Sequence, residues 1–279
     1  MLVTRSCLCL CRLFFALWAT TPSAQALEFA SLNASGPLSD ARATCTAMVL
    51  PAGTSFYDCA RAYVFGHLNN VRESKGPAQL HILQVAARIN LATAAPSPRL
   101  LEIGCGALAL AKELVPLLPV DGYVCIEPNN WLNVASLQHN LVFLQHVLEK
   151  RALFLRRTDF DASELGRKFD LVFSHSILSH AGLPQLREWL RGAARVLAAG
   201  GAAVASLYHH DLSTGKYDVP DSAHEKWVYP GVTILSKASV ATAAAEVGLK
   251  FEPELGPSLR EWYASRTGER HDWAVFRWA

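Results

Sequence analysis

The chain has 279 residues, and its 26 lysines and arginines nearly balance its 24 aspartates and glutamates, for a formal net charge of +2. Residues 1–26 hold two arginines and no acid, so without them the chain has 24 residues of each sign and is neutral. Because nucleic-acid binding usually needs a basic surface, we expect no nucleic-acid partner. A hydrophobic content of 51% is enough for a buried core and excludes a wholly disordered chain.

The first 26 residues differ from the rest. Arg5 precedes a mainly apolar stretch at 7–19, and the segment ends in the small-x-small pattern Ala24-Gln25-Ala26. This resembles a secretory signal peptide, while the lack of acids also fits an organelle transit peptide. We expect entry into the secretory pathway or secretion, with a mitochondrion or plastid as the alternative. Once this presequence is removed, we expect no integral membrane span, since no later apolar run approaches ~20 residues.

Residues 27–76 are predicted to form an N-terminal extension with a helix at 57–72. Two cysteines, Cys45 and Cys59, lie in this extension. In an oxidising compartment they would pair as a disulfide, and in a reducing one they would be two buried thiols. Both alternatives stay open on the sequence.

From residue 77 to 279, strands and helices are predicted to alternate in one domain. Apolar stretches indicate strands at 99–103, 122–127, 153–157, 169–174, 202–208, 249–255 and 272–278. Helical spacing occupies 80–91, 109–118, 131–150, 184–197 and 237–247. This alternation predicts an α/β fold, a Rossmann-like, doubly wound, mostly parallel seven-stranded sheet. No helix is predicted between the last two strands, so we expect the last strand to be antiparallel.

A glycine-rich turn follows the first predicted strand. Gly104-Cys105-Gly106 lies between that strand and the helix that begins at Ala109. Glycine lets a ligand approach backbone N–H groups, and open α/β sheets bind ligands at the carboxyl ends of their parallel strands. Glu127 ends the second strand, 21 residues after Gly106, where a carboxylate can accept hydrogen bonds from both hydroxyls of a ribose. The pattern predicts a cofactor that contains a nucleoside.

The residue two positions before the first glycine decides between cofactors. The spacing Gly104-x-Gly106-x-x-Ala109 also fits a dinucleotide fingerprint, which leaves an NAD-dependent dehydrogenase as an alternative. Glu102 would repel a pyrophosphate and favour a cationic group. S-adenosylmethionine has an ammonium, a sulfonium and no phosphate, so the charge favours this cofactor.

Taken together, these segments resemble the class I S-adenosylmethionine-dependent methyltransferases. The stretches that carry the resemblance are 100–106, 123–129, 169–175 and 195–201. Leu108 stands where the family often has a third glycine. The resemblance implies that the cofactor is bound by Glu102, Gly104, Cys105 and Gly106 at its methionine part, by Glu127, Pro128 and Asn129 near the ribose, by Asp159 and Phe160 near the adenine, and by Ser174. For Asp159, a helix cap is the alternative role.

The candidate catalytic residues are histidines at the ends of two strands. His175 and His180 follow the fourth strand, and His209 and His210 follow the fifth. Methyl transfer is an in-line displacement that needs a base only if the acceptor must lose a proton. Any of the four could act as that base, because histidine titrates near neutral pH, and a structural role is the alternative for each.

These observations lead to a methyltransferase that acts on a small-molecule acceptor. A catalytically silent S-adenosylmethionine-binding module is the alternative. The chain contains no Cys-x-x-Cys or His-Glu-x-x-His motif, and adjacent histidines such as His209 and His210 rarely aim at one ion, so we expect no metal. The sequence indicates no oligomeric state.

Overall fold

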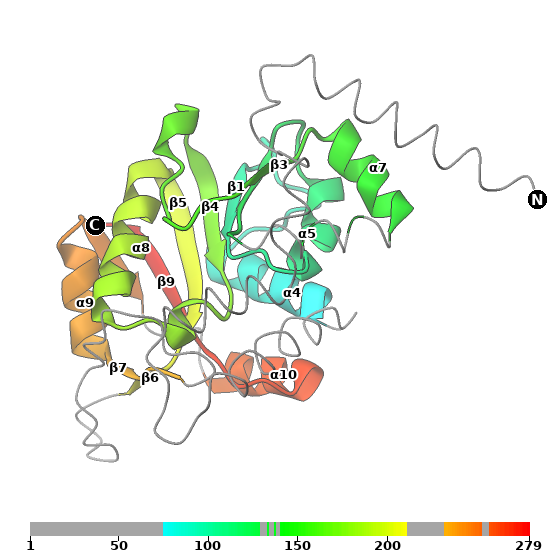
Figure 1. Cartoon of the computed structure of the whole chain (residues 1–279). Helices are drawn as coiled ribbons and strands as arrows, with labels where there is room; N and C mark the ends of the chain where they lie inside the picture. The colour runs from blue at the N-terminus through cyan, green and yellow to red at the C-terminus, as the bar shows by residue number, and fades with distance from the viewer. Residues whose placement is uncertain (1–74, 129–132, 134–136, 138–139, 211–231, 253–256) are drawn as a thin grey trace, which may run out of the picture.

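The computed structural model describes residues 75–128, 133, 137, 140–210, 232–252 and 257–279 (Figure 1). Within these residues, strands and helices alternate along the chain. The predicted targeting segment, the Cys45–Cys59 pair and the predicted helix at 57–72 lie outside the described residues.

Seven strands form one sheet. They are β1 (Leu100–Ile103), β2 (Tyr123–Ile126), β3 (Leu153–Leu155), β4 (Phe169–Ser174), β5 (Leu197–Leu207), β8 (Leu249–Glu252) and β9 (Asp272–Trp278). Their order is β3-β2-β1-β4-β5-β9-β8, and only β9 runs antiparallel to its neighbours. The predicted mostly parallel seven-stranded sheet with an antiparallel last strand is therefore confirmed. A separate two-stranded pair joins β6 (His209–His210) and β7 (Leu235–Ser236).

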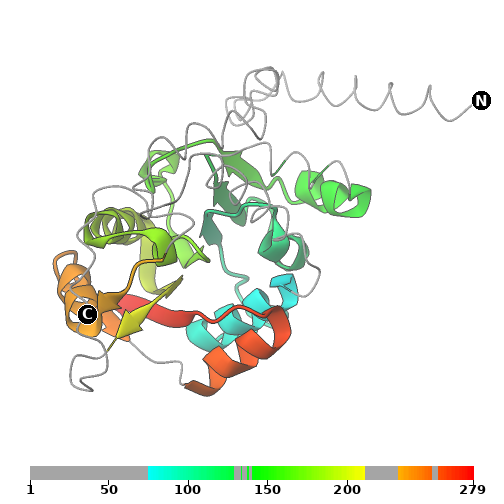
Figure 2. The same ribbon diagram turned by 60° about the horizontal axis from the view of Figure 1, so that its bottom comes forward.

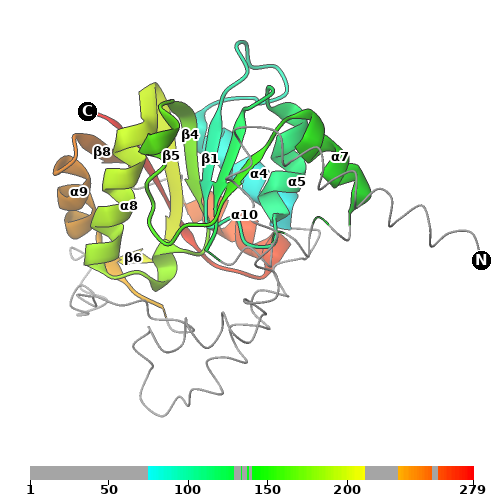
Figure 3. The same ribbon diagram turned by 45° about the horizontal axis from the view of Figure 1, so that its top comes forward.

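Helices cover both faces of the sheet (Figure 3). One face packs against α4 (Lys75–Ala87), α5 (Ala109–Leu114), α7 (Leu141–Glu149) and α10 (Pro257–Thr267). The other face packs against α8 (Leu183–Val196) and α9 (Lys237–Ala245). Three short 3-10 helices, η3 (Val115–Leu117), η4 (Ser163–Leu165) and η5 (Leu178–His180), complete the connections.

The two helical layers enclose two hydrophobic cores. Neighbouring residues on β1 alternate between them, with Leu100 on the face of α4 and α5 and Leu101 on the face of α8. In α8, Leu186, Trp189 and Leu190 recur at helical spacing and are fully buried against the sheet. Because both faces are covered, the central strands are mainly apolar and buried rather than alternating.

The absence of a helix between the last two strands was a wrong prediction. Helix α10 occupies this interval and packs beside α4 (Figure 2). Its apolar anchors are few, with Leu259 and Tyr263 one turn apart among mainly polar and charged residues. Such a short stripe gives weak helical periodicity. The last strand is antiparallel nonetheless, because β9 inserts between β5 and β8 and runs against both.

Within the helical stretch predicted at 131–150, the described residues Asn133 and Leu137 are helical, and helix α7 begins at Leu141. The side chain of Asn140 caps this helix by accepting a hydrogen bond from the backbone N–H of Phe143, at 2.9 Å. Among the described helices, none combines the length and apolar character that crossing a membrane requires.

Candidate cofactor and active site

The two glycines of the turn after β1 both adopt the left-handed backbone region, with φ of +77° at Gly104 and +49° at Gly106. A Cβ on Gly104 would lie 2.4 Å from Cδ1 of Ile177, so this glycine lets Ile177 pack against the turn. A Cβ on Gly106 would meet no atom within 4 Å. The space beside Gly106 is therefore open to a ligand that approaches the backbone.

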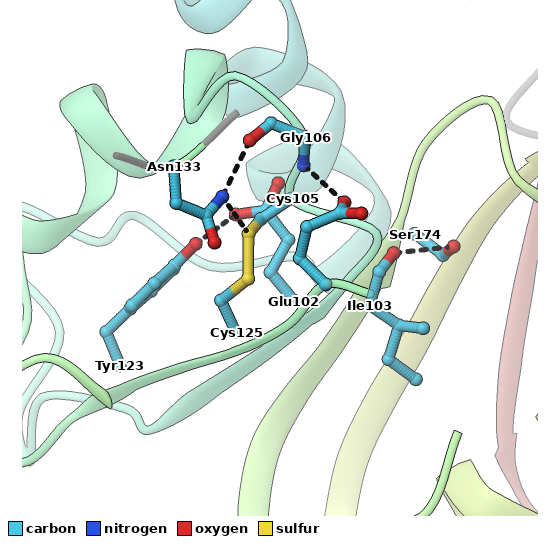
Figure 4. The surroundings of a disulfide bond; sticks show 9 residues. Glu102, Ile103, Cys105, Gly106, Tyr123, Cys125, Asn133 and Ser174 are labelled. Carbon is cyan, nitrogen blue, oxygen red and sulfur yellow. Dashed lines mark hydrogen bonds between the residues drawn. A yellow bond between two sulfur atoms is a disulfide. The ribbon is translucent and has the colours of Figure 1, made fainter. Parts of the chain in front are cut away.

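The carboxylate of Glu127 lies beside this turn, as the sequence predicted. The backbone N–H of Gly106 donates a hydrogen bond of 2.9 Å to Oε2 of Glu127, which is buried. From the other side, Nδ2 of Asn133 donates to the carbonyl of Gly106 at 2.7 Å (Figure 4). The open space at Gly106 and the adjacent carboxylate fit a nucleoside with free ribose hydroxyls. Asn133 was missed by sequence reasoning, because no motif singles it out.

Glu102 is buried on β1 and accepts a 2.5 Å hydrogen bond from the hydroxyl of Tyr123 (Figure 4). Burial raises the pKa of Glu102 to about 7, against the opposing effect of the Tyr123 hydrogen bond and with a further increase from the charge of Glu127. At neutral pH the side chain is therefore only partly ionised. This modifies the electrostatic argument from the sequence, because a cation beside Glu102 would favour its ionised form.

A disulfide joins Cys105 in the turn to Cys125 on β2, with Cα atoms 6.0 Å apart (Figure 4). The parallel register of β1 and β2 places Cys125 opposite Glu102, which brings it close to the turn. The sequence indicated Cys45 and Cys59 as the candidate pair and not these two cysteines, since strand register is not visible in the sequence. The bond fastens the glycine turn to the strand that leads into Glu127.

Leu108 takes the left-handed conformation with φ of 61° just before α5 begins. A glycine would adopt this backbone without strain, which explains the glycine that the family often has there. The side chain of Leu108 is fully buried in the core between the sheet and α5. Leucine at this position contributes core packing at the expense of backbone strain.

The remaining predicted cofactor residues are less clearly grouped. Ser174 is buried, and its hydroxyl donates to the carbonyl of Ile103 at 3.0 Å, which ties the end of β4 to the end of β1. Phe160 packs against the core on the α8 face. Pro128 is exposed, and Asn129 lies outside the described residues.

Asp159 is exposed and forms a two-point ion pair with Arg157, at 2.8 and 2.9 Å, which lowers its pKa. In line with the alternative role as a cap for the turn at 161–165, its Oδ1 also accepts a long hydrogen bond of 3.4 Å from the backbone N–H of Asp161. The carboxylate of Asp161 in turn accepts from the backbone N–H of Ser163 at the start of η4, at 2.8 Å.

His175 is the predicted catalytic histidine that the described structure groups with other chemically active side chains. Its Nε2 lies 2.9 Å from the hydroxyl of Tyr263 and 3.8 Å from Oε2 of Glu269. Its ring lies 4.9 Å from the ring of His271, centroid to centroid. The ammonium of Lys75 contacts Oε1 of Glu269 at 2.5 Å. We call these five residues the His175 cluster.

The antiparallel direction of β9 explains how this cluster assembles. The start of β9 lies beside the end of β5, with Asp272 opposite Leu207, so His271 reaches the carboxyl edge of the parallel strands. Helix α10 supplies Tyr263, and α4 supplies Lys75. Sequence reasoning missed these residues and Glu269 because it placed no helix at α10. Burial lowers the pKa of His175 well below its usual value, and His271 adds to this effect.

The other predicted histidines have different surroundings. His180 ends η5 and lies near enough to lower the pKa of His175 slightly. The backbone N–H of His209 donates to Asp272 at 3.2 Å, and its ring meets the ring of Phe251 edge-on. His210 is on β6, and its side chain lies outside the described residues. Between His175 and η5, Ser176 has a strained φ of 56°, a feature that is frequent at functional sites.

Comparison with known proteins adds one family match. Residues 101–203 match the family model described as a methyltransferase domain. No curated protein matches this sequence. The chain is similar to Streptomyces venezuelae DesVI (15% identity, 79% of this chain and 98% of that chain, TM-score 0.49). It is similar to the sugar N-methyltransferase KedS8 of a Streptoalloteichus species (17% identity, 82% of this chain and 95% of that chain, TM-score 0.49). It is also similar to human N-acetylserotonin methyltransferase in complex with SAM (16% identity, 82% of this chain and 60% of that chain, TM-score 0.49).

The matched residues span β1 to β5 and contain the glycine turn, Glu127 and His175. They include the open backbone at Gly106 and the buried carboxylate beside it. The strand order with an antiparallel β9 agrees with the fold expected from the sequence. The chain thus contains a match to a methyltransferase domain over residues 101–203, the part of the sheet that carries the glycine turn and Glu127.

Proposed function

We propose that the protein is a class I S-adenosylmethionine-dependent methyltransferase that acts on a small-molecule acceptor bound at the carboxyl edge of the sheet, between the glycine turn and the His175 cluster. The observation that supports the proposal is the adjacency of the two groups. The glycine turn follows β1 and His175 follows β4, and these strands are neighbours in the sheet. A methyl donor on the turn and an acceptor near His175 would then lie next to each other.

The main role of the side chains would be to hold the methyl donor and the acceptor in place. S-adenosylmethionine supplies a methyl group on a positively charged sulfur. Glu127 would accept hydrogen bonds from the ribose hydroxyls, and Glu102, once ionised, would stabilise the positive charges of the methionine part. Ser174 holds the ends of β1 and β4 together, which keeps donor and acceptor in register.

The His175 cluster supports a small acceptor. Lys75, Tyr263 and His271 are each nearly or fully buried, and the side chain of His175 is only 9% exposed. Such a site admits a small polar group more readily than a protein surface or a nucleic acid. Among the predicted histidines, we therefore propose His175 as the residue that contacts the acceptor.

Calorimetric titration with S-adenosylhomocysteine tests the cofactor site. Glu127→Ala should weaken binding by about 10- to 100-fold, because hydrogen bonds to a charged group contribute about 1.5–3 kcal/mol. Glu149→Gln, an exposed glutamate on α7, is the matched control and should bind normally. Equal affinity in both variants, or preferential binding of NADH, would contradict the assignment.

Radiolabelled methyl transfer tests the acceptor class. We expect labelled methyl groups in members of a panel of small hydroxyl and amine compounds. His175→Ala should lose this transfer while it still binds S-adenosylhomocysteine. Label that enters only added protein or RNA would refute a small-molecule acceptor. Cofactor binding without transfer to any acceptor would instead indicate a silent binding module.

We also propose, from residues 1–26, that the protein enters the secretory pathway. The Cys105–Cys125 disulfide supports this route, since disulfides persist in oxidising compartments. N-terminal sequencing of the mature protein tests it: cleavage after Ala26 supports the proposal, and import into a mitochondrion or plastid contradicts it.

A further inference from the structure

Three metal-ligating side chains converge within the His175 cluster. His175, Glu269 and His271 each offer one ligand atom, and these atoms lie within 4.8 Å of one another. Oε2 of Glu269 is 3.8 Å from Nε2 of His175 and 3.8 Å from Nε2 of His271. Ligands that are each about 2.0–2.2 Å from one tetrahedral zinc ion lie about 3.3–3.6 Å apart, so the two 3.8 Å distances are within a few tenths of an ångström of the spacing for a shared ion.

Two polar atoms of this group lack a hydrogen-bond partner among the described residues. Oε2 of Glu269 is buried and accepts no hydrogen bond from the described residues, and Nδ1 of the buried His271 is also without one there. A direct N–H···O bond would need about 2.7–3.2 Å, and both imidazole nitrogens are farther from Oε2 than this. A small ion bound between the three side chains would give Oε2 of Glu269 a partner.

We propose that His175, Glu269 and His271 form a binding site for one divalent transition-metal ion, of which zinc is the best-suited probe. Two imidazoles and one carboxylate are a common zinc ligand set, and such sites leave a further position for water or substrate. The set departs from the expectation of no metal. That expectation considered His209, His210 and their neighbours, whereas these ligands follow β4 and precede β9.

Two neighbours shape this site. Lys75 contacts Oε1 of Glu269 and so leaves Oε2 toward the two histidines. Its positive charge also opposes a metal ion, so the site should bind zinc more tightly in Lys75→Met. The hydroxyl of Tyr263, 2.9 Å from Nε2 of His175, must give up this contact or become a further oxygen ligand.

If the proposed function holds, the ion would have a role at the acceptor. A metal ion that binds an acceptor oxygen lowers the pKa of its hydroxyl and holds it in place. This role rests on the proposed small-molecule methyl transfer, while metal binding itself does not. The acceptor class that fits is a small molecule with a hydroxyl group or an adjacent pair of oxygen ligands.

The test is zinc titration of the full chain after removal of metals with a chelator, followed by calorimetry. Cobalt(II) is the second probe, because its visible absorption reports nitrogen and oxygen ligation. We expect one zinc per chain and at least ~100-fold weaker binding in His271→Ala and Glu269→Gln, because outer-shell changes alone cost 10–100-fold. His146→Ala, at a partly exposed histidine on α7 away from the cluster, should bind like the unchanged chain.

Circular dichroism establishes that each variant folds, and the isosteric Glu269→Gln keeps the test valid if His271→Ala does not. Absence of zinc binding by the folded, unchanged chain would overturn the proposal. So would equal binding in Glu269→Gln and the unchanged chain, which would place the metal elsewhere. Binding of S-adenosylhomocysteine, measured without zinc, separates the metal-site proposal from the proposed methyl transfer. If this binding persists while zinc fails to bind, only the metal site is refuted.

Discussion

The glycine turn and the His175 cluster lie at the same edge of the sheet but are built by different means. The turn is held by local features: a backbone hydrogen bond to Glu127, a disulfide to the adjacent strand and the paired ladder of β1 and β2. The cluster is held by side chains that come from α4, the end of β4, α10 and the start of β9. We infer that the turn is a rigid cofactor platform, while the cluster is more open to change.

Removal of the disulfide should produce the largest effect on the turn. The bond closes a loop with a sequence separation of 20, for which chain entropy gives about 3 kcal/mol of stabilisation. The double variant Cys105→Ala/Cys125→Ala should lose about this much in urea unfolding and bind S-adenosylhomocysteine more weakly. Unchanged stability and affinity would show that the disulfide does not fasten the platform.

The pH dependence of Glu102 sharpens the same comparison. The pKa of Glu102 is about 7 in the folded protein, against an ordinary value of 4.5 that applies to the unfolded chain. Its protonated form is favoured by folding, so the contribution to stability is complete below pH 4.5 and is lost as the pH rises through 7. Glu102→Gln should therefore unfold like the unchanged chain at pH 4.5 and be more stable by up to about 3 kcal/mol at pH 8.5.

Glu149→Gln, on the exposed face of α7, is the control for Glu102→Gln. It should show the same pH profile as the unchanged chain. A flat difference between Glu102→Gln and the unchanged chain across this range would contradict a raised pKa.

A glycine pair tests the packing of the turn. Gly104 and Gly268 share a φ of +77°, but only at Gly104 would a Cβ meet another side chain, that of Ile177. Both alanine variants should lose about 1 kcal/mol to backbone strain, and Gly104→Ala should lose about 2 kcal/mol more through overpacking. Adding Ile177→Ala should recover part of that difference in thermal unfolding. Equal losses at the two glycines would mean that Ile177 does not restrict the turn.

The smallest expected effect lies in the cluster. Tyr263→Phe removes the hydroxyl that contacts His175 and should cost about 1 kcal/mol of stability. Because no hydrogen bond or ring contact of Tyr263 among the described residues reaches the glycine turn, affinity for S-adenosylhomocysteine should stay unchanged, in contrast to the disulfide variant. A comparable loss of cofactor affinity in both variants would show that turn and cluster act as one unit.

The turn could be predicted because its chemistry lies in short, ordered stretches. Gly104, Gly106 and Glu127 follow successive strands, and the ends of neighbouring parallel strands must meet at one edge. Ser174 was found in the same way, although its hydroxyl ties two strands together rather than meeting open space. The same reasoning reached His175, but not the residues around it.

The sequence by itself determined the alternation of strands and helices, the glycine turn and the acidic residue that follows β2, because each depends on local pattern and spacing. Only the tertiary structure decided the Cys105–Cys125 bond, which depends on strand register, and the partly protonated state of Glu102, which depends on burial. It also decided the meeting of His175 with Glu269 and His271. Contacts between residues nearly a hundred positions apart depend on chain direction and packing, which no local pattern records.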